Sequence, residues 1–202
     1  MQPVESEVGL RERVRRKARE SARTIEAFFE READRVVECC RVLAEALDNG
    51  GRLFVMGNGG SACDAQHLAV EFTHPVVAKR RAFPATALVN DIAWLTATGN
   101  DDDFAVAFAE QLRLLARSGD IVIGLSTSGQ SANVNRALRV ARDMELRTVG
   151  IAGKDGGRLK DVCDYLFVVP SYSIHRIQET QGVLLHVMWD LIHIGRGEED
   201  VL

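Results

Sequence analysis

Four hydroxyl side chains fall within six consecutive positions, at Ser126, Thr127, Ser128 and Ser131, with Gly129 among them. They lie between an apolar run typical of a buried strand and a segment with helical periodicity. A helix N-terminus presents unpaired N–H groups and favours anions, and hydroxyls add further donors. Serine and threonine also cap helices without binding a ligand. Because four hydroxyls exceed what one cap needs, we expect a phosphate monoester to bind here.

His67 and Glu71 form a second candidate. They are four residues apart in a segment predicted to be helical, which places both side chains on one face, about 6 Å apart along the axis. That spacing suits two ligands of one metal ion, or an acid–base pair. It is also the spacing of an ordinary surface ion pair, which on its own is the commoner arrangement. The pair alone therefore leaves both interpretations open.

Two further segments carry weaker signals. The loop Gly57-Asn58-Gly59-Gly60-Ser61 follows a short apolar run but lacks both the dinucleotide-binding glycine pattern and the P-loop lysine. Its glycines suit a tight turn or the close approach of a ligand. Gln178 and His186 lie in the closing helical segment, where the neighbours of His186 are apolar. A histidine in such a stretch is more often a core residue than a functional one.

The elements that must position these residues alternate in type. Residues 8–47 have helical spacing, as one long helix or two consecutive ones. Predicted strands and helices then follow in turn: strands at 52–56, 84–89, 120–124, 147–152 and 165–169, and helices at 61–72, 104–117, 132–144 and 177–194. This alternation predicts a parallel sheet with helices on both faces, which binds ligands at the carboxyl ends of its strands. The loops after Met56 and Gly124 both fall there.

Composition limits the class of protein. The chain has 202 residues, of which 46% are hydrophobic and 27% charged, with a net charge of -4, so we expect one domain that binds no nucleic acid. No apolar run reaches the ~18 residues that a membrane helix needs, and the charged N-terminus does not resemble a secretory signal. The four cysteines form no C-x-x-C pair. We therefore expect a reduced, cytoplasmic protein without membrane contact.

Five segments together resemble the phosphoheptose isomerases of the sugar-isomerase (SIS) domain group, from about residue 20 to residue 194. The segments are Gly57-Asn-Gly-Gly-Ser-Ala-Cys-Asp-Ala-Gln-His67, Gly99-Asn-Asp101, Ser126-Thr-Ser-Gly-Gln-Ser-Ala-Asn133, Gly153-Lys-Asp-Gly-Gly157 and Arg176-Ile-Gln-Glu179. The resemblance implies one flavodoxin-like, three-layer α/β/α SIS domain over residues 1–202. It would comprise an N-terminal helical segment, 1–48, and an α/β core, 52–195. It also implies a homotetramer with active sites at subunit interfaces.

The same resemblance implies a role for each candidate residue. Glu71 would be the catalytic base and His186 its acid–base partner, converting sedoheptulose 7-phosphate to D-glycero-D-manno-heptose 7-phosphate through an enediol, a step of heptose biosynthesis. The residues implied to hold one zinc ion per subunit are His67, Glu71, Gln178 and His186. The residues implied to bind the substrate are Asn58, Gly59, Gly60, Glu71, Asn90, Asp91, Ser126, Thr127, Ser128, Ser131 and Gln178.

Two features conflict with a simple transfer of these roles. Gln178 and His186 are eight residues apart, about 12 Å along an unbroken helix. Both can reach one zinc ion only if Gln178 lies at or before the helix start, or if another subunit contributes. Residues 73–81 also depart from the pattern expected after the catalytic helix, which leaves an isomerase of another phosphosugar as an alternative.

A third interpretation is a binding protein without catalysis. Some SIS proteins bind the bacterial replication initiator, and the basic cluster from Arg11 to Arg19 could serve such a partner. A charge run on a helix is more often a solvated face. Those binding proteins lack an acidic residue at the position of Glu71, so the sequence favours the isomerase.

Overall fold

The computed structural model describes residues 7–78 and 80–200. Its centre is a five-stranded parallel sheet in the order β2-β1-β3-β4-β5. This is the flavodoxin-like order. Strand β2 is added on one side of β1, and β3, β4 and β5 are added on the other side, so the topological switch point lies between β1 and β3. β1 and β3 are buried along their whole lengths, as central strands covered on both faces must be. The strands are β1 Leu53–Met56, β2 Ala85–Ala87, β3 Ile121–Ser126, β4 Arg147–Ala152 and β5 Tyr165–Val168.

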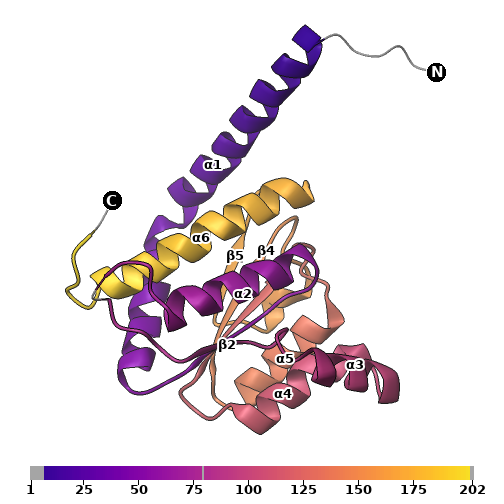
Figure 1. Ribbon diagram of the computed structural model, residues 1–202, viewed down its shortest axis with the longest axis vertical. Coiled ribbons are helices and arrows are strands. Elements are labelled where there is room, and N and C mark those ends of the chain that lie inside the picture. Colours follow the sequence, from indigo (N-terminus) through magenta and orange to yellow (C-terminus); the bar gives the residue numbers. More distant parts are fainter. Residues whose placement is uncertain (1–6, 79, 201–202) are drawn as a thin grey trace.

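Two helical layers cover the sheet (Figure 1). One apolar core joins the sheet to α1 Glu7–Asp48, α2 Gly60–Thr73 and α6 Ile174–Ile194. The second core, on the opposite face, is built with α4 Ala107–Leu115 and α5 Ala132–Asp143, and α3 Ile92–Asp101 packs at its margin. The predicted three-layer α/β/α fold is therefore confirmed.

The N-terminal segment is one helix of 42 residues. Its buried positions begin at Phe28 and continue to Leu47, along the part that packs on the body. The preceding turns extend well beyond the rest of the molecule (Figure 1). Val8, Leu10 and Val14 on these turns are exposed. The first half of α1 thus has apolar side chains without cover in a single subunit.

Several boundaries differ from the predictions, most of them by one residue, and the larger differences are these. The predicted helix 104–117 is a short 3-10 turn, η1 Phe104–Val106, followed by α4, and a second such turn, η2 Gly157–Asp161, precedes β5. β2 is shorter than predicted, and β3 continues through Ser126. α6 begins at Ile174, three residues before the predicted start.

The sequence prediction also missed α3. None of its residues is fully buried, so it lacks the apolar stripe on which periodicity depends. Asp91 accepts a hydrogen bond from the Trp94 N–H at 2.8 Å. Such a cap was the available sequence signal for this helix. Among the described residues, no helix has the length and apolar character needed to cross a membrane.

Candidate active site

Two adjacent helices bring three ionisable side chains together. His67 and Glu71 lie one turn apart on α2, and His186 lies on α6, which packs against α2 (Figure 1). His67 Nε2 is 3.3 Å from Glu71 Oε1 and 3.4 Å from His186 Nε2. The three potential ligand atoms all lie within 4.8 Å of one another. The structure thus places a third ionisable side chain, from 119 positions away in sequence, beside the pair of His67 and Glu71.

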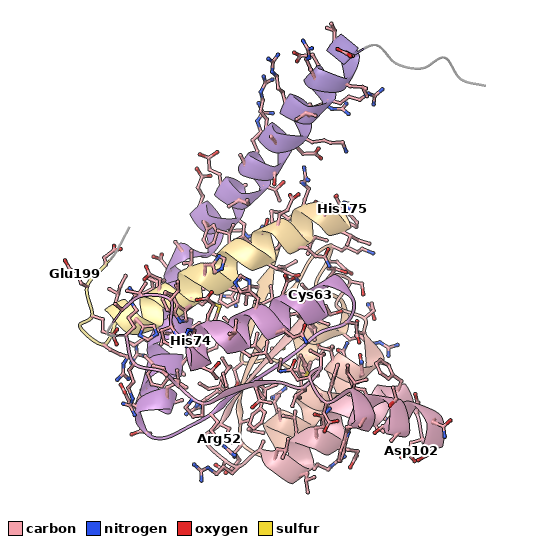
Figure 2. The ribbon with its side chains drawn as sticks, in the orientation of Figure 1. Arg52, Cys63, His74, Asp102, His175 and Glu199 are labelled. Carbon is pink, nitrogen blue, oxygen red and sulfur yellow. The ribbon has the colours of Figure 1, made fainter. Side chains whose placement is uncertain are left out.

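The cluster is open to solvent on one side. The His67 side chain is 48% exposed, whereas that of Glu71 is 18% exposed. The α2 helix runs between Cys63, near its start, and His74, just past its end, as labelled in Figure 2. This arrangement lets a ligand reach both histidines while the carboxylate stays partly shielded.

Asp64 lies one turn before His67 on α2 and was not predicted as a site residue. Burial raises the pKa of its carboxyl group, while the charge of His67 acts in the opposite direction. Its Oδ2 atom is buried with no hydrogen-bond partner among the described residues. An Asp three residues before a helical His was the sequence signal for this neighbour.

The segment with four hydroxyl side chains, Ser126 to Ser131, lies at the carboxyl end of β3 and is called the hydroxyl loop here. Ser126 is its last strand residue, and it is buried rather than part of the loop as predicted. Its Oγ lies 2.9 Å from Ser131 Oγ, and Ser128 Oγ accepts from the Gln130 N–H at 3.2 Å. Ser131 occupies the N-cap position of α5 but makes no side-chain capping bond. The interpretation of the hydroxyl residues as an ordinary helix cap requires such a bond. No serine cap therefore occupies the first N–H groups of α5.

An amide pair joins the first turn of α5, which follows the hydroxyl loop, to the glycine-rich loop. Asn58 Nδ2 donates to Asn133 Oδ1 at 2.9 Å, and Asn133 Nδ2 donates back to Asn58 Oδ1 at 2.9 Å. Asn133 is almost fully buried. Asn133 is the last residue of the segment Ser126–Asn133 that resembles the isomerases. It was not predicted as a site residue, because its partner is 75 positions away. The pair holds the glycine-rich loop against the start of α5, at the carboxyl ends of β1 and β3.

Comparison with known proteins establishes the family. A family model of the SIS domain matches residues 18–153. The phosphoheptose isomerase of Thermodesulfovibrio yellowstonii is 41% identical over 193 residues, which are 96% of this chain and 93% of that protein. The chain belongs to the phosphoheptose isomerase family. The structure of the Neisseria gonorrhoeae phosphoheptose isomerase matches with a TM-score of 0.85 and 38% identity, covering 91% of this chain and 98% of that one.

A phosphoheptose isomerase structure from Francisella tularensis gives a TM-score of 0.87 at 30% identity, covering 91% of this chain and 97% of that one. Both structural matches and the sequence match extend over nearly the whole chain. The resemblance inferred from the five motifs is thereby confirmed, and so is the isomerase class.

Gln178 lies away from the histidine cluster of its own subunit. It falls inside α6, which is continuous from Ile174 to Ile194, so it is about 12 Å from His186 along the axis. Its side chain packs instead on Gly60, where an added Cβ would stand 2.4 Å from Gln178 Nε2. The requirement that Gln178 precede the helix is not met. A role for Gln178 at the metal then needs a neighbouring subunit, while its place beside the glycine-rich loop fits substrate binding.

Asn90 and Asp91 follow β2 at the same edge of the sheet. The Asn90 Oδ1 atom accepts from Gln66 Nε2 at 2.8 Å, so it is fastened to α2 beside His67. Asp91 is engaged as the cap of α3. Gln66 was not predicted, although it adjoins His67 in sequence. Of the two predicted residues, Asn90 is therefore the one held against the helix that carries the cluster.

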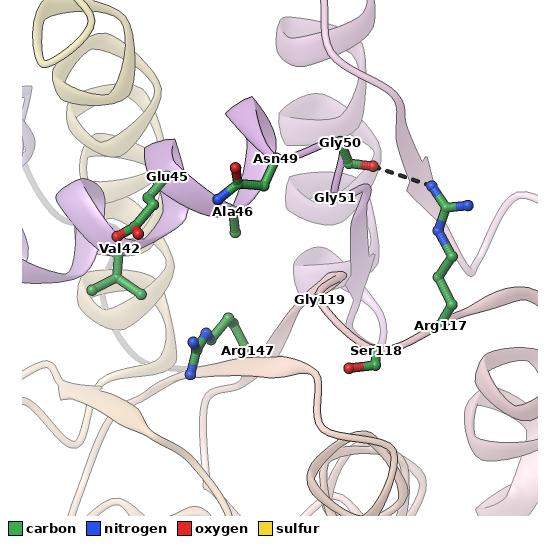
Figure 3. A pocket seen from close by; sticks show the side chains of 10 residues that line it. All are labelled: Val42, Glu45, Ala46, Asn49, Gly50, Gly51, Arg117, Ser118, Gly119 and Arg147. Atoms are coloured by element: carbon green, nitrogen blue, oxygen red, sulfur yellow. Dashed lines mark hydrogen bonds between the residues drawn. The ribbon is translucent and has the colours of Figure 1, made fainter.

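The opposite edge of the sheet has a hollow of its own, with a volume of about 270 Å³ (Figure 3). It lies between the end of α1 and the starts of β3 and β4, where Arg117 donates to the Gly50 carbonyl at 3.2 Å. It contains none of the predicted site residues. Because parallel α/β sheets bind ligands at the carboxyl ends of their strands, we assign the site to the other edge.

Proposed function

We propose that this protein is an aldose–ketose isomerase that converts sedoheptulose 7-phosphate to D-glycero-D-manno-heptose 7-phosphate. The observation that carries the proposal is the convergence of His67, Glu71 and His186, on a chain whose relatives are named phosphoheptose isomerases. A carboxylate and two imidazoles in contact offer a base, an acid and metal ligands, which an enolisation needs. The cluster therefore favours catalysis.

The reaction moves the carbonyl group from C2 to C1. Glu71 takes a proton from C1, giving an enediol, and returns it to C2, while His186 carries the hydroxyl proton between the two oxygens. These two side chains come from adjacent helices and share contact with His67. No atom is gained or lost, so the residues need only hold the sugar and move protons.

The cluster also fits a zinc ion. Two ligands about 2.0–2.1 Å from a tetrahedral zinc are about 3.3–3.4 Å apart, and two imidazoles with a carboxylate form a common catalytic ligand set. The Nε2 atom of His67 lies 3.3 Å from Glu71 and 3.4 Å from His186. We propose that His67, Glu71 and His186 hold one zinc per subunit, with Gln178 supplied by a neighbouring subunit. When bound, the ion would stabilise negative charge that develops on the substrate oxygens.

Substrate binding divides between two regions. Ser126, Thr127, Ser128 and Ser131 would hold the phosphate at the N-terminus of α5, where backbone N–H groups favour an anion. The residues that would line the sugar are Asn58, Gly59, Gly60, Glu71, Asn90, Asp91 and Gln178. The reacting carbons and the phosphate are at opposite ends of a heptose phosphate, which suits a catalytic cluster separated from the hydroxyl loop.

We further propose that the chain acts as one SIS domain within a homotetramer whose active sites lie at subunit interfaces. The exposed apolar residues of the first turns of α1 support this assembly, because they find no cover within one subunit. We place the enzyme in the cytoplasm, since its four cysteines are free and reduced thiols suit that compartment. Burial raises the pKa of Cys40 and Cys163 to about 12, which fits thiols that stay protonated near neutral pH.

The proposal is tested by turnover of sedoheptulose 7-phosphate with added zinc and after chelation. We expect formation of an aldoheptose 7-phosphate that falls on chelation and returns when zinc is restored. Turnover that survives complete metal removal would retain the isomerase and reject the metal. A folded protein inactive under both conditions would reject this substrate.

Ser128→Ala is expected to weaken substrate binding more than it slows the chemical step. A hydrogen bond to a charged group contributes about 1.5–3 kcal/mol, so KM should rise about tenfold or more with kcat little changed. Steady-state kinetics measure both constants. Ser118→Ala is the matched control, because Ser118 also bears an engaged hydroxyl but lies at the opposite edge of the sheet. Equal KM values for the two variants would contradict the phosphate loop.

A further inference from the structure

The end of α2 leaves one backbone carbonyl in need of a donor. A helical C=O normally accepts from the N–H four residues later, and for Glu71 that position is Pro75. Proline has no N–H, so the helix itself cannot satisfy this carbonyl. The indole of Trp189 supplies the donor, with Nε1 2.9 Å from the Glu71 carbonyl oxygen. The main chain of Glu71 is thus held by a side chain of α6.

The neighbouring carbonyls of α2 find backbone donors instead. The His74 N–H donates to the Val70 carbonyl at 2.8 Å, and the Phe83 N–H donates to the Phe72 carbonyl at 2.8 Å. Only at Glu71, among these three positions, does the bond come from a side chain of another helix. The indole bond is therefore specific to the residue proposed as the base.

Trp189 is itself fixed in place. It is 6% exposed, and the guanidinium of Arg80 lies 4.5 Å above its ring centre. Arg80 is 8% exposed, and its Nη2 atom lies 2.5 Å from Asp190 Oδ1 and donates to the Glu199 carbonyl at 3.1 Å. A buried guanidinium packed on the aromatic face limits the movement of the indole. Arg80, in the segment after α2, thus packs on Trp189, whose indole donates to α2 at Glu71.

We propose that Trp189 is a positioning residue for the isomerisation and that Arg80 orients it. Trp189 lies three residues after His186 on α6, on the adjacent turn. Its bond to the Glu71 carbonyl joins the backbones that carry the base and its acid–base partner. This inference rests on the proposed function, because it takes Glu71 as the base. It also assigns a role to Pro75 and Arg80, which lie in the segment after α2.

The test compares two tryptophan variants of the whole protein. Trp189→Phe keeps an aromatic face for Arg80 and deletes the N–H donor. Trp94→Phe is the matched control, because Trp94 is the second of the two tryptophans and its Nε1 also donates to a backbone carbonyl, that of Ala107, at 3.2 Å. That bond lies in the helical layer on the other face of the sheet. Each variant thus loses one indole–carbonyl bond, and only one of those bonds is at Glu71.

We expect Trp189→Phe to lower kcat about tenfold or more while KM stays within about twofold, since a small misplacement of a reacting group costs much of its rate. The deuterium isotope effect on kcat, with both C1 hydrogens replaced, should rise because proton transfer becomes slower. Trp94→Phe should change neither quantity. A smaller fraction of folded enzyme would lower kcat without altering the isotope effect, which separates positioning from simple loss of stability.

Arg80→Lys provides a second variant should Trp189→Phe fail to fold. It keeps a charge beside Asp190 and removes the planar group over the indole, so it should shift kcat and the isotope effect in the same direction by a smaller factor. If the wild-type protein turns over and the folded variants have the same kcat and isotope effect as the wild type, this inference alone is overturned. Absence of turnover in the wild-type protein would overturn the proposed function and this inference with it.

Discussion

Glu71→Gln is expected to fold normally and to lose turnover, with kcat reduced by about 10²–10⁴-fold, the range that general-base catalysis contributes. Glutamine has nearly the same shape as glutamate, but its amide cannot accept the C1 proton. The carboxylate contributes little to stability, because its contact with His67 is an i,i+4 pair whose imidazole is 48% exposed. The substitution therefore tests the proposed chemical roles of Glu71, as base and as metal ligand, apart from its contribution to stability.

The measurement combines kcat with exchange of the C1 hydrogens in deuterated water. Loss of both turnover and exchange would place the defect at proton abstraction. Glu110→Gln is the control, since Glu110 forms a similar helical pair with Arg113 at 2.5 Å on α4, away from the site. A folded Glu71→Gln protein that turned over like the wild type would remove Glu71 from the mechanism.

The sheet was predictable from sequence because its central strands are buried on both faces. β1 and β3 are short continuous apolar runs that end at loops rich in glycine or hydroxyl residues, and the alternation of such strands with helices predicts a parallel sheet. The hydroxyl loop was found for the same reason. α3 was missed because it covers the margin of the core with partly exposed residues, so its sequence carries no clear period.

The histidine cluster was only partly predictable. The spacing of His67 and Glu71 places both on one face of α2, but nothing local to His186 distinguishes it from the core of α6. Its role entered through family resemblance, and the contact with His67 depends on how α2 packs against α6. Trp189 and Arg80 gave no local signal at all. The bond from Trp189 to Glu71 spans 118 positions, and its cause, the missing N–H of Pro75, is visible only once that partner is known.

Gly129→Ala is expected to damage the hydroxyl loop more than any single hydroxyl deletion. Gly129 has φ +65°, and an added Cβ would stand 2.1 Å from the Gly156 carbonyl oxygen. The obstacle is backbone, held by a bond from the Arg158 N–H to the Gly129 carbonyl at 3.0 Å, so it cannot move aside like a flexible side chain. Strain of about 1–2 kcal/mol from the positive φ adds to about 1–3 kcal/mol from overpacking.

Gly119→Ala is the control that measures only the strain from a positive φ, without the overpacking. Gly119 has φ +90° with nothing within 4 Å of an added Cβ, so it should lose only the 1–2 kcal/mol of conformational strain. Thermal unfolding of both variants at one protein concentration compares them, since the proposed assembly would make the midpoint depend on concentration. Gly129→Ala should melt lower and show a higher KM, because the displaced loop would no longer present the N-terminus of α5 to the phosphate. Equal melting temperatures and KM values would mean that the turn at Gly156 yields and does not hold the loop.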